Sequence, residues 1–417
     1  MKKPFHKHVI HGAKNFHRHF TKYLYERDTV FATLWVFVFI IVLGSIPLNL
    51  GIMNPLKLGL KDFDFNDLYY SKVGNKQNTP IDSNIVIINI GHADRELIAM
   101  IVEKTASMNP KVMGLDVLFD EPKEPAQDSL LQETFKKHKN LVVAAKFELD
   151  SADKFTLVRN CFKKDALNCG YVNFSNEDKE TTRYFFPFKT DGHTTFSSFS
   201  STLVKLFDPE AFQKLGKKGD SRVMINYTRT VTERKKQYWI IESEKLMIGD
   251  VDSGLIKGKI ALLAYVNIDP NDIEDKKFTP LNEKYAGKST PDMNGILVHA
   301  NIISMVLEKN YVKKLPSWAS WLIAILICWL HMSFFIRYYL ESHIWFHLVA
   351  KIAQVASAIF FVWLGIELFS RYHLKVDLKL SLIVIIMAVD VIYFYEAWAV
   401  WMHKKFKFHT VFKPHQH

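Results

Sequence analysis

The chain has 417 residues, of which 48% are hydrophobic and 14% aromatic, and its formal net charge is +11. The length predicts two or three domains, and the apolar residues gather in four long runs, which excludes an ordinary soluble protein. The basic excess lies at the ends: residues 1–28 carry seven Lys and Arg against two acids, and residues 403–417 carry four Lys and no acid. We interpret these ends as topology signals that attract anionic lipids and not as a nucleic-acid site, because no nucleic-acid-binding motif accompanies them.

Each of the four apolar runs is long enough to cross a bilayer as a helix. Four spans place both ends of the chain on one side of the membrane, and Lys and Arg collect on the cytoplasmic side, so count and charge both predict cytoplasmic ends. The block 54–315 then lies outside the cytoplasm. No small-x-small cleavage site follows the first run, so we expect a retained anchor and not a cleaved signal peptide. The predicted spans are residues 29–48, 316–336, 344–369 and 378–402.

The outward block opens with a predicted strand, helix and strand. Asn84–Ile90 is a short run rich in Ile and Val, which is typical of a buried strand. Asp94 offers a side-chain oxygen to the first turn of a helix, and the Asn-Pro pair at 109–110 ends that helix. Lys111–Phe119 is a second apolar strand, so we expect the two strands to pair in parallel.

The rest of the block alternates strands and helices, which predicts an α/β fold with a mixed sheet and flanking helices. Residues 140–147 and 259–266 are apolar enough to be core strands. Shorter strands are predicted at 171–174 and 183–188, which we expect to be antiparallel, and at 222–227 and 237–241. The predicted helices are residues 129–138, 195–207 and 295–308.

The cysteines and histidines allow few metal or redox sites. Cys161 and Cys169 lie eight residues apart in the outward block, where an oxidising compartment favours a disulfide; the alternative is two thiols that are not bonded to each other. The five His residues of 1–28 follow no ligand spacing, so we predict a polar, lipid-facing tail and no metal.

Motifs for catalysis and for cofactor binding are absent from the sequence. It contains neither Gly-x-x-x-x-Gly-Lys-Ser/Thr nor Gly-x-Gly-x-x-Gly, and neither Gly-x-Ser-x-Gly nor His-Glu-x-x-His. We therefore predict no catalytic residue, no cofactor and no enzyme activity.

Four residues of the outward block are candidate ligand contacts. Asp116 lies in a predicted strand and Asp120 follows four residues later, near the strand end where ligands of parallel sheets often bind. His299 and Asn301 lie on the predicted helix nearest the second span. The structural alternative is that Asp116 caps backbone amides and that His299 and Asn301 hold the fold by hydrogen bonds.

Asp390 is the most distinctive polar residue of the spans, because it falls near the middle of the last one. A mid-bilayer acid costs at least about 2.5 kcal/mol on insertion scales and usually faces protein or water. We expect its partner to be Lys351 or His331 on neighbouring spans, or another chain. Helix association or assembly is the expected role, and ion or proton passage is the alternative.

A family resemblance extends over residues 62–310. The segments IVIINI, MGLDVLFDEP, GYVNF, VMINY, GKIALLA, FTPL and MNGILVHAN follow one another in the order found in the CHASE2 domain, which this block resembles. Two positions depart from the family pattern. The segment His92–Arg95 stands where the family usually has a Trp-Pro-rich stretch, and Ala264 stands where it often has Gly.

The resemblance implies an extracytoplasmic sensory module of a bacterial membrane receptor. Such receptors usually continue into a kinase, a cyclase or a similar output domain, whereas this chain stops after a 15-residue basic tail, so we expect no effector in it. We predict a sensor in the bacterial inner membrane that passes a periplasmic signal or partner contact, through helix 295–308, to a separate signalling effector. Expected partners are membrane lipids and other membrane or envelope proteins, with a homo-oligomer as a further option. The alternative is a structural scaffold subunit of a multiprotein cell-envelope complex.

Overall fold

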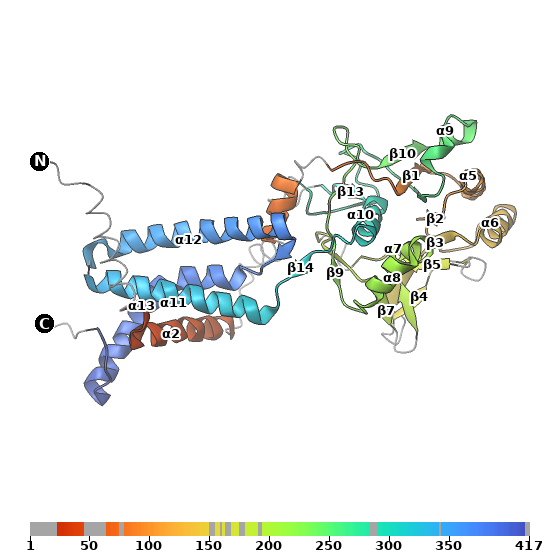
Figure 1. The fold of residues 1–417 in the computed structure, drawn as a ribbon. Helices are drawn as coiled ribbons and strands as arrows, with labels where there is room; N and C mark the ends of the chain where they lie inside the picture. The colour runs from red at the N-terminus through yellow and green to blue at the C-terminus, as the bar shows by residue number, and fades with distance from the viewer. Residues whose placement is uncertain are drawn as a thin grey trace, which may run out of the picture. The chain divides into compact units, whose positions relative to one another are not determined.

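The chain forms two compact units, which we describe separately (Figure 1). Gly59–Val312 is the α/β unit, and Met1–Leu58 together with Lys313–His417 is the helical unit. The basic, His-bearing residues 1–22 and the terminal residues 413–417 lie outside the described part. The computed structural model describes residues 23–45, 64–74, 79–149, 155–158, 161–162, 168–174, 180–190, 194–282, 290–341 and 343–412.

The α/β unit is built on a seven-stranded sheet of order β10-β1-β11-β2-β3-β4, with β5 also paired to β3. Every pair is parallel except β3 with β4. The central strands β1, β2 and β11 are almost wholly buried, as expected for a parallel sheet that is covered on both faces. The strands are β1 (Ile85–Asn89), β2 (Val112–Leu115), β3 (Leu141–Leu149), β4 (Phe155–Val158), β5 (Asn168–Tyr171), β10 (Trp239–Glu242) and β11 (Ile260–Ala264).

Two pairing predictions are corrected by this sheet. The strands β1 and β2 are parallel but not adjacent, because β11 returns from far along the chain and lies between them, with Leu262 opposite both Ile87 and Gly114. The strand β5 is parallel to β3 and not antiparallel, because the chain first turns back through β4 and then re-enters beside the start of β3. Both corrections depend on long-range pairing, which local sequence patterns do not encode.

Helices cover both faces of the sheet, so the predicted α/β fold with flanking helices is confirmed. The helices α5 (Arg95–Ser107), α6 (Pro125–Lys137) and α9 (Ser243–Ile248) share one apolar core with β1, β2, β3 and β11. On the opposite face, α7 (Phe199–Phe207) packs on β2, β3 and β5, and α8 (Pro209–Gly216) and α10 (Gly295–Leu307) pack on α7. The helix α5 begins as predicted, with the Asp94 carboxylate accepting a hydrogen bond from the N–H of Leu97.

Two glycines allow α7 to approach the sheet closely. A Cβ at Gly170 of β5 would lie 2.5 Å from Cα of Phe199, and one at Gly114 of β2 would lie 2.9 Å from the Phe199 ring. At Gly170 only Gly fits, because the backbone of α7 comes this near, and this position fixes the distance between α7 and β5. At Gly114 the close neighbours are the side chains of Phe199 and Leu203.

Short elements complete the two units. Outside the large sheet, the described part of the α/β unit forms the antiparallel strand pairs β6 with β9, β7 with β8 and β12 with β13, and the helical unit forms the parallel pair β14 with β15. The remaining bounds are α4 (Phe65–Leu68), η2 (Tyr69–Val73), β6 (Tyr184–Phe185), β7 (Phe188–Thr190), β8 (Thr195–Ser197), β9 (Val223–Met224), η4 (Ser253–Leu255), β12 (Lys276–Lys277), β13 (Met293–Asn294), β14 (Lys313–Lys314) and β15 (Leu374–Lys375).

The predicted disulfide does not occur in this structure. Cys161 lies in a turn where its N–H donates to the carbonyl of Phe119 at 2.8 Å. Cys169 is held in β5, opposite Val143 of β3. Each cysteine is fixed by a different partner, and the structure does not join them through their sulfur atoms.

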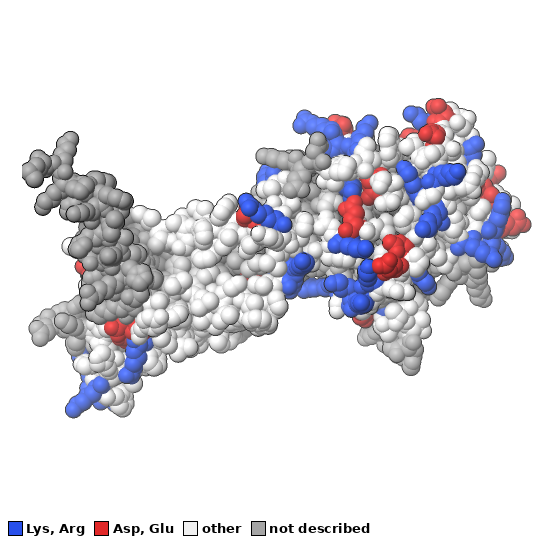
Figure 2. Space-filling model, in the orientation of Figure 1, with Lys and Arg blue, Asp and Glu red and all other residues white. Residues whose placement is uncertain are grey.

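Within its described residues, the helical unit contains four helices that are long and apolar enough to cross a membrane. The helix α13 packs on α11 and α2, and α11 also packs on α2 and α12. The face of this bundle seen in Figure 2 carries few charged side chains between its ends, whereas Lys, Arg, Asp and Glu are spread over the α/β unit. The bounds are α2 (Arg27–Ser45), α11 (Ser317–Glu341), α12 (His343–Tyr372) and α13 (Lys379–Phe406).

Candidate functional site

A cavity of about 460 Å³ opens at the carboxyl edge of the sheet, and we call it the edge cavity. Residues that follow β2, β5 and β11 form one side of it, together with Lys146 of β3. The strand β12, the residue before it and the first turns of α10 form the other side. Ligands of parallel α/β sheets commonly bind at this edge, where the ends of several strands bring side chains together.

Asp116 lines this cavity, because it directly follows Leu115, the last residue of β2. Its N–H still donates to the carbonyl of Leu263 at 2.9 Å, which holds the backbone in line with the sheet. Among the described residues, no group donates a hydrogen bond to its carboxylate. Burial, and then the negative charge of Asp275, raise the pKa of Asp116 to about 7, against the opposing effect of Lys277.

Asp275 lies on the same cavity wall, just before β12, with a left-handed backbone at φ 50°. Its carbonyl accepts the N–H of Gly295 at 2.9 Å, at the first residue of α10. A Cβ at Gly295 would lie 3.3 Å from either carboxylate oxygen, so the carboxylate sits against the positive end of that helix. Burial raises the pKa of Asp275, while Lys277 and the Gly295 N–H oppose the rise.

His299 projects from α10 into the edge cavity although only 3% of its surface is exposed. Its Nδ1 lies 2.9 Å from Oγ of Ser200, and its ring packs 4.7 Å from the ring of Phe174 and 5.3 Å from that of Phe199. Burial, reinforced by the charge of Lys277, lowers the pKa of His299 to about 3, so the imidazole is neutral. No described residue bonds to its Nε2.

The structure brings together two of the four predicted ligand contacts and separates the other two. Asp116 and His299 face the same cavity. Asp120 is exposed and is not part of the cavity wall. Asn301 is fully buried: its Oδ1 accepts the N–H groups of Thr228 and Arg229, and its Nδ2 donates to the carbonyls of Arg229 and Leu297. All these contacts are structural, as the alternative for Asn301 predicts.

Sequence reasoning missed several residues of the cavity. Asp275 and Lys277 belong to a polar stretch with no strand or helix period, and Glu180 and Thr182 belong to a loop. Tyr265 offered the one usable signal, because it directly follows β11 at the same edge as Asp116.

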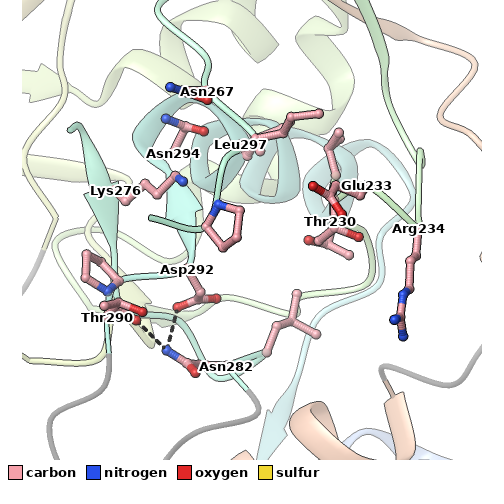
Figure 3. A pocket seen from close by; sticks show the side chains of 16 residues that line it. Thr230, Glu233, Arg234, Asn267, Lys276, Asn282, Thr290, Asp292, Asn294 and Leu297 are labelled. Carbon is pink, nitrogen blue, oxygen red and sulfur yellow. Dashed lines mark hydrogen bonds between the residues drawn. The ribbon is translucent and has the colours of Figure 1, made fainter. Parts of the chain in front are cut away.

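A second cavity, of about 360 Å³, lies on the other side of the β12–β13 pair (Figure 3). Lys276 and Asn294 line the second cavity, whereas their neighbours Lys277 and Gly295 line the edge cavity. In the second cavity Asp292 accepts the N–H of Thr279 at 2.8 Å, and Figure 3 shows Asn282 bonded to it as well. The β12–β13 pair and the start of α10 therefore form a wall common to both cavities.

The far end of α10 is anchored by a buried ionic group. Arg229 donates from Nη2 to Glu308 at 2.6 Å and from Nε to the carbonyl of Pro80 at 3.2 Å, and its Nη1 lies 3.5 Å from Asp82. Ser304 of α10 also donates to Asp82. This helix is thus held to the rest of the α/β unit at its C-terminal end, while its N-terminal end forms cavity wall.

The polar residues predicted in the spans do not pair with one another. His331 contacts the carbonyl of Ile327 through Nδ1 and Oγ of Ser357 through Nε2, and Asp390 and Lys351 are both exposed on the helical unit. Pairing of Asp390 with another chain stays a prediction. Among the described residues, no group of three His, Cys, Asp or Glu side chains is arranged to hold a metal ion.

Comparison with known proteins identifies the family. The model of the CHASE2 domain matches residues 36–335, well over half of the chain, whereas no curated protein and no solved structure matches it. CHASE2 domains are extracytoplasmic sensory domains, which agrees with an α/β unit on a chain with four apolar helices of spanning length. The chain belongs to the CHASE2 domain family.

Proposed function

We propose that this protein is a non-catalytic sensor subunit of the bacterial inner membrane. Its α/β unit lies in the periplasm, both ends of the chain lie in the cytoplasm, and the signal passes to a separate protein. The observation that carries the proposal is the position of α10, because this helix supplies His299 and Gly295 to the edge cavity and leads along the chain into α11.

The edge cavity has the features of a ligand site. It is concave, it lies where several strands end, and it holds a buried imidazole together with two carboxylates whose pKa values are raised. Perturbed ionisable groups in a cleft favour a functional site over a purely structural one.

The relay depends on how few residues separate the cavity from the membrane helix. Only residues 308–316 lie between the end of α10 and the start of α11. Within the α/β unit, Asn226 holds this connection by donating from Nδ2 to the carbonyl of Asn310 at 3.1 Å. Because this connection is short and is fixed at Asn310, a shift of α10 on ligand binding also displaces residues 308–316.

Inserting Gly-Ser-Gly after Asn310 tests the relay. The insertion should leave ligand binding intact and abolish the response of the partner protein, because the connection becomes slack. The same insertion after Gly219, in an exposed turn of the α/β unit, serves as the control and should preserve both. An unchanged response with the insertion after Asn310 would contradict the relay.

The rival function is a scaffold subunit of a cell-envelope complex. It is favoured by Asp390, an acid exposed on a helix of spanning length, because such a residue usually meets protein or water. Purification of the native protein in mild detergent, followed by mass spectrometry, separates the two functions. A sensor should come alone or with one cytoplasmic signalling enzyme whose activity changes in Asp116→Asn. A fixed-ratio set of envelope proteins that is indifferent to Asp116→Asn would favour the scaffold.

A further inference from the structure

Among the described residues, the side chains that line the edge cavity include one more carboxylate than lysine ammonium groups. With His299 neutral, three carboxylates face two lysine ammonium groups, so the balance is one negative charge when all five are ionised. A negative charge in a partly desolvated cleft attracts a cation more strongly than the same charge at an open surface. The five charged residues are Asp116, Glu180, Asp275, Lys146 and Lys277.

Three hydrogen-bond acceptors at the cavity wall have spare capacity. The Asp116 carboxylate receives no hydrogen bond from any described residue, and the Asp275 carboxylate can accept further donors, since the nearby Gly295 N–H donates to the Asp275 backbone carbonyl. The third acceptor is Nε2 of His299, which can accept when Nδ1 carries the proton and donates to Ser200. Because His299 lines the cavity and no described residue bonds to its Nε2, a bound ligand can supply the partner of this nitrogen.

The cation that fits this wall is an organic molecule and not a metal ion. Among the described residues, no three acidic, histidine or cysteine side chains are grouped as metal ligands require. An ammonium group instead offers three N–H donors, which match the three acceptors, and Phe174 adds an aromatic surface at the wall.

We propose that the edge cavity binds a small molecule through an ammonium group, which the carboxylates of Asp116 and Asp275 and the Nε2 of His299 hold together. The inference rests on the proposed sensor function and assigns the class of its ligand. A carboxylate elsewhere on the same molecule would face Lys146 or Lys277, so an amino acid or its decarboxylated amine fits the wall better than an acid without an amine.

Matched pairs of probes test this assignment on the full-length protein in nonionic detergent at low salt. The pairs are ethanolamine with ethylene glycol, putrescine with 1,4-butanediol, and β-alanine with propionate, so only the ammonium group distinguishes the members. Calorimetric titration should show at least one amine binding, and its uncharged or acidic counterpart should bind at least tenfold more weakly. Failure of every amine to bind, or equal binding of both members of each pair, would overturn the inference.

Two variants locate the bound amine. Asp116→Asn and Asp275→Asn keep the side-chain size and should each weaken amine binding about tenfold or more. Asp120→Asn, at an exposed position outside the cavity, should leave it unchanged. Melting temperatures of the unliganded variants show that each is folded, and unaltered binding in both cavity variants would contradict the site.

The outcome also separates this inference from the proposed function. If glycols or acids bind and Asp116→Asn weakens them, the ligand class is wrong while the sensing cavity stands. If no probe binds and Asp116→Asn also leaves the partner response unchanged, both the ligand class and the sensor function are wrong.

Discussion

Asp116 combines two properties at a single residue: its backbone continues a buried strand, and its side chain faces the edge cavity beside Asp275. The other charged or titratable groups on the cavity wall are Glu180, Lys146, Lys277, Tyr265 and His299. Because burial raises the pKa of Asp116 to about 7, this carboxyl is partly protonated at neutral pH and responds to small changes in its surroundings.

A first prediction concerns stability and pH. The folded protein keeps the Asp116 proton up to about pH 7, whereas the unfolded chain loses it near its ordinary pKa of about 4. Between these values the unfolded state binds fewer protons, so the contribution of Asp116 to the free energy of unfolding falls as pH rises from about 4 to about 7. Urea titrations followed by pulse proteolysis at several pH values should show this fall, and Asp116→Asn should reduce its slope; the rest of the slope belongs to other carboxyls whose pKa burial raises, such as Asp292. A slope as steep in Asp116→Asn as in the unchanged protein, or one that falls equally in the control Asp120→Asn, would contradict the assignment.

A second prediction concerns Gly170. An Ala side chain there would place its Cβ 2.5 Å from Cα of Phe199, so Gly170→Ala should lower the free energy of unfolding by about 3 kcal/mol, the upper end of the usual cost of overpacking. Gly216→Ala is the matched control, because its Cβ would meet no atom within 4 Å and Ala is the better helix former. Equal stability of the two variants, measured by urea titration, would show that α7 can move away from β5.

At this scale the sequence identified part of the site. The position of Asp116 in the second predicted strand indicated this residue, and the position of His299 on the predicted helix nearest the second span indicated that one. Asp275 could not be found, because its place depends on a left-handed backbone and on contact with Gly295, twenty residues later in the chain. Asn301 looked equivalent to His299 in sequence, and only the packing of α10 turns one into the cavity and the other toward Arg229.

Among the elements, α10 connects the cavity to the rest of the molecule. Its N-terminal turn is part of the wall between two cavities, and its C-terminal end is held by Arg229 through Glu308. The apolar run at 295–308 was sufficient to predict this helix, and the apolar runs at 84–90, 140–147 and 259–266 were sufficient to predict strands. Their order in the sheet was not predictable, because β11 pairs with β2 and β1, whose paired residues lie 148 and 175 positions earlier in the chain.

A third prediction concerns the anchor of α10. Arg229→Met removes the cation that lies between Asp82 and Glu308 and leaves Asp82, which is 3% exposed, without its counterion. Breaking a buried ion pair in this way should cost about 3 kcal/mol. Lys214→Met breaks the exposed pair with Glu210 and should change stability little. If urea titration finds the two variants equally stable, Arg229 does not anchor the helix.

For the whole molecule, composition and charge predict the sidedness of the membrane. The four apolar helices agree with the four predicted runs, and the basic ends predict that residues 1–28 and 403–417 are cytoplasmic. The orientation of the chain in the membrane is predicted from the Lys and Arg residues at its two ends, and not from the fold of either unit.

A fourth prediction tests this sidedness by cysteine labelling. Cys161 is exposed on the α/β unit, so a membrane-impermeant maleimide should label it in cells whose outer membrane alone is permeabilised. In a background with both Cys161→Ser and Cys169→Ser, Lys404→Cys should be labelled only after the inner membrane is opened, because the exposed Lys404 follows the last predicted span. Labelling of Lys404→Cys from outside the inner membrane would contradict the proposed topology.

The most direct measurement of the central claim is amide hydrogen exchange of the full-length protein, with and without the amine that binds most tightly. We predict that the amine slows exchange around Asp116 and along α10, and that the slowing continues into residues 308–316, which lead to α11. Asp116→Asn should abolish all of these changes at the same amine concentration. Slowing that stays confined to the cavity wall, with residues 308–316 unchanged, would contradict a sensor that signals through this helix.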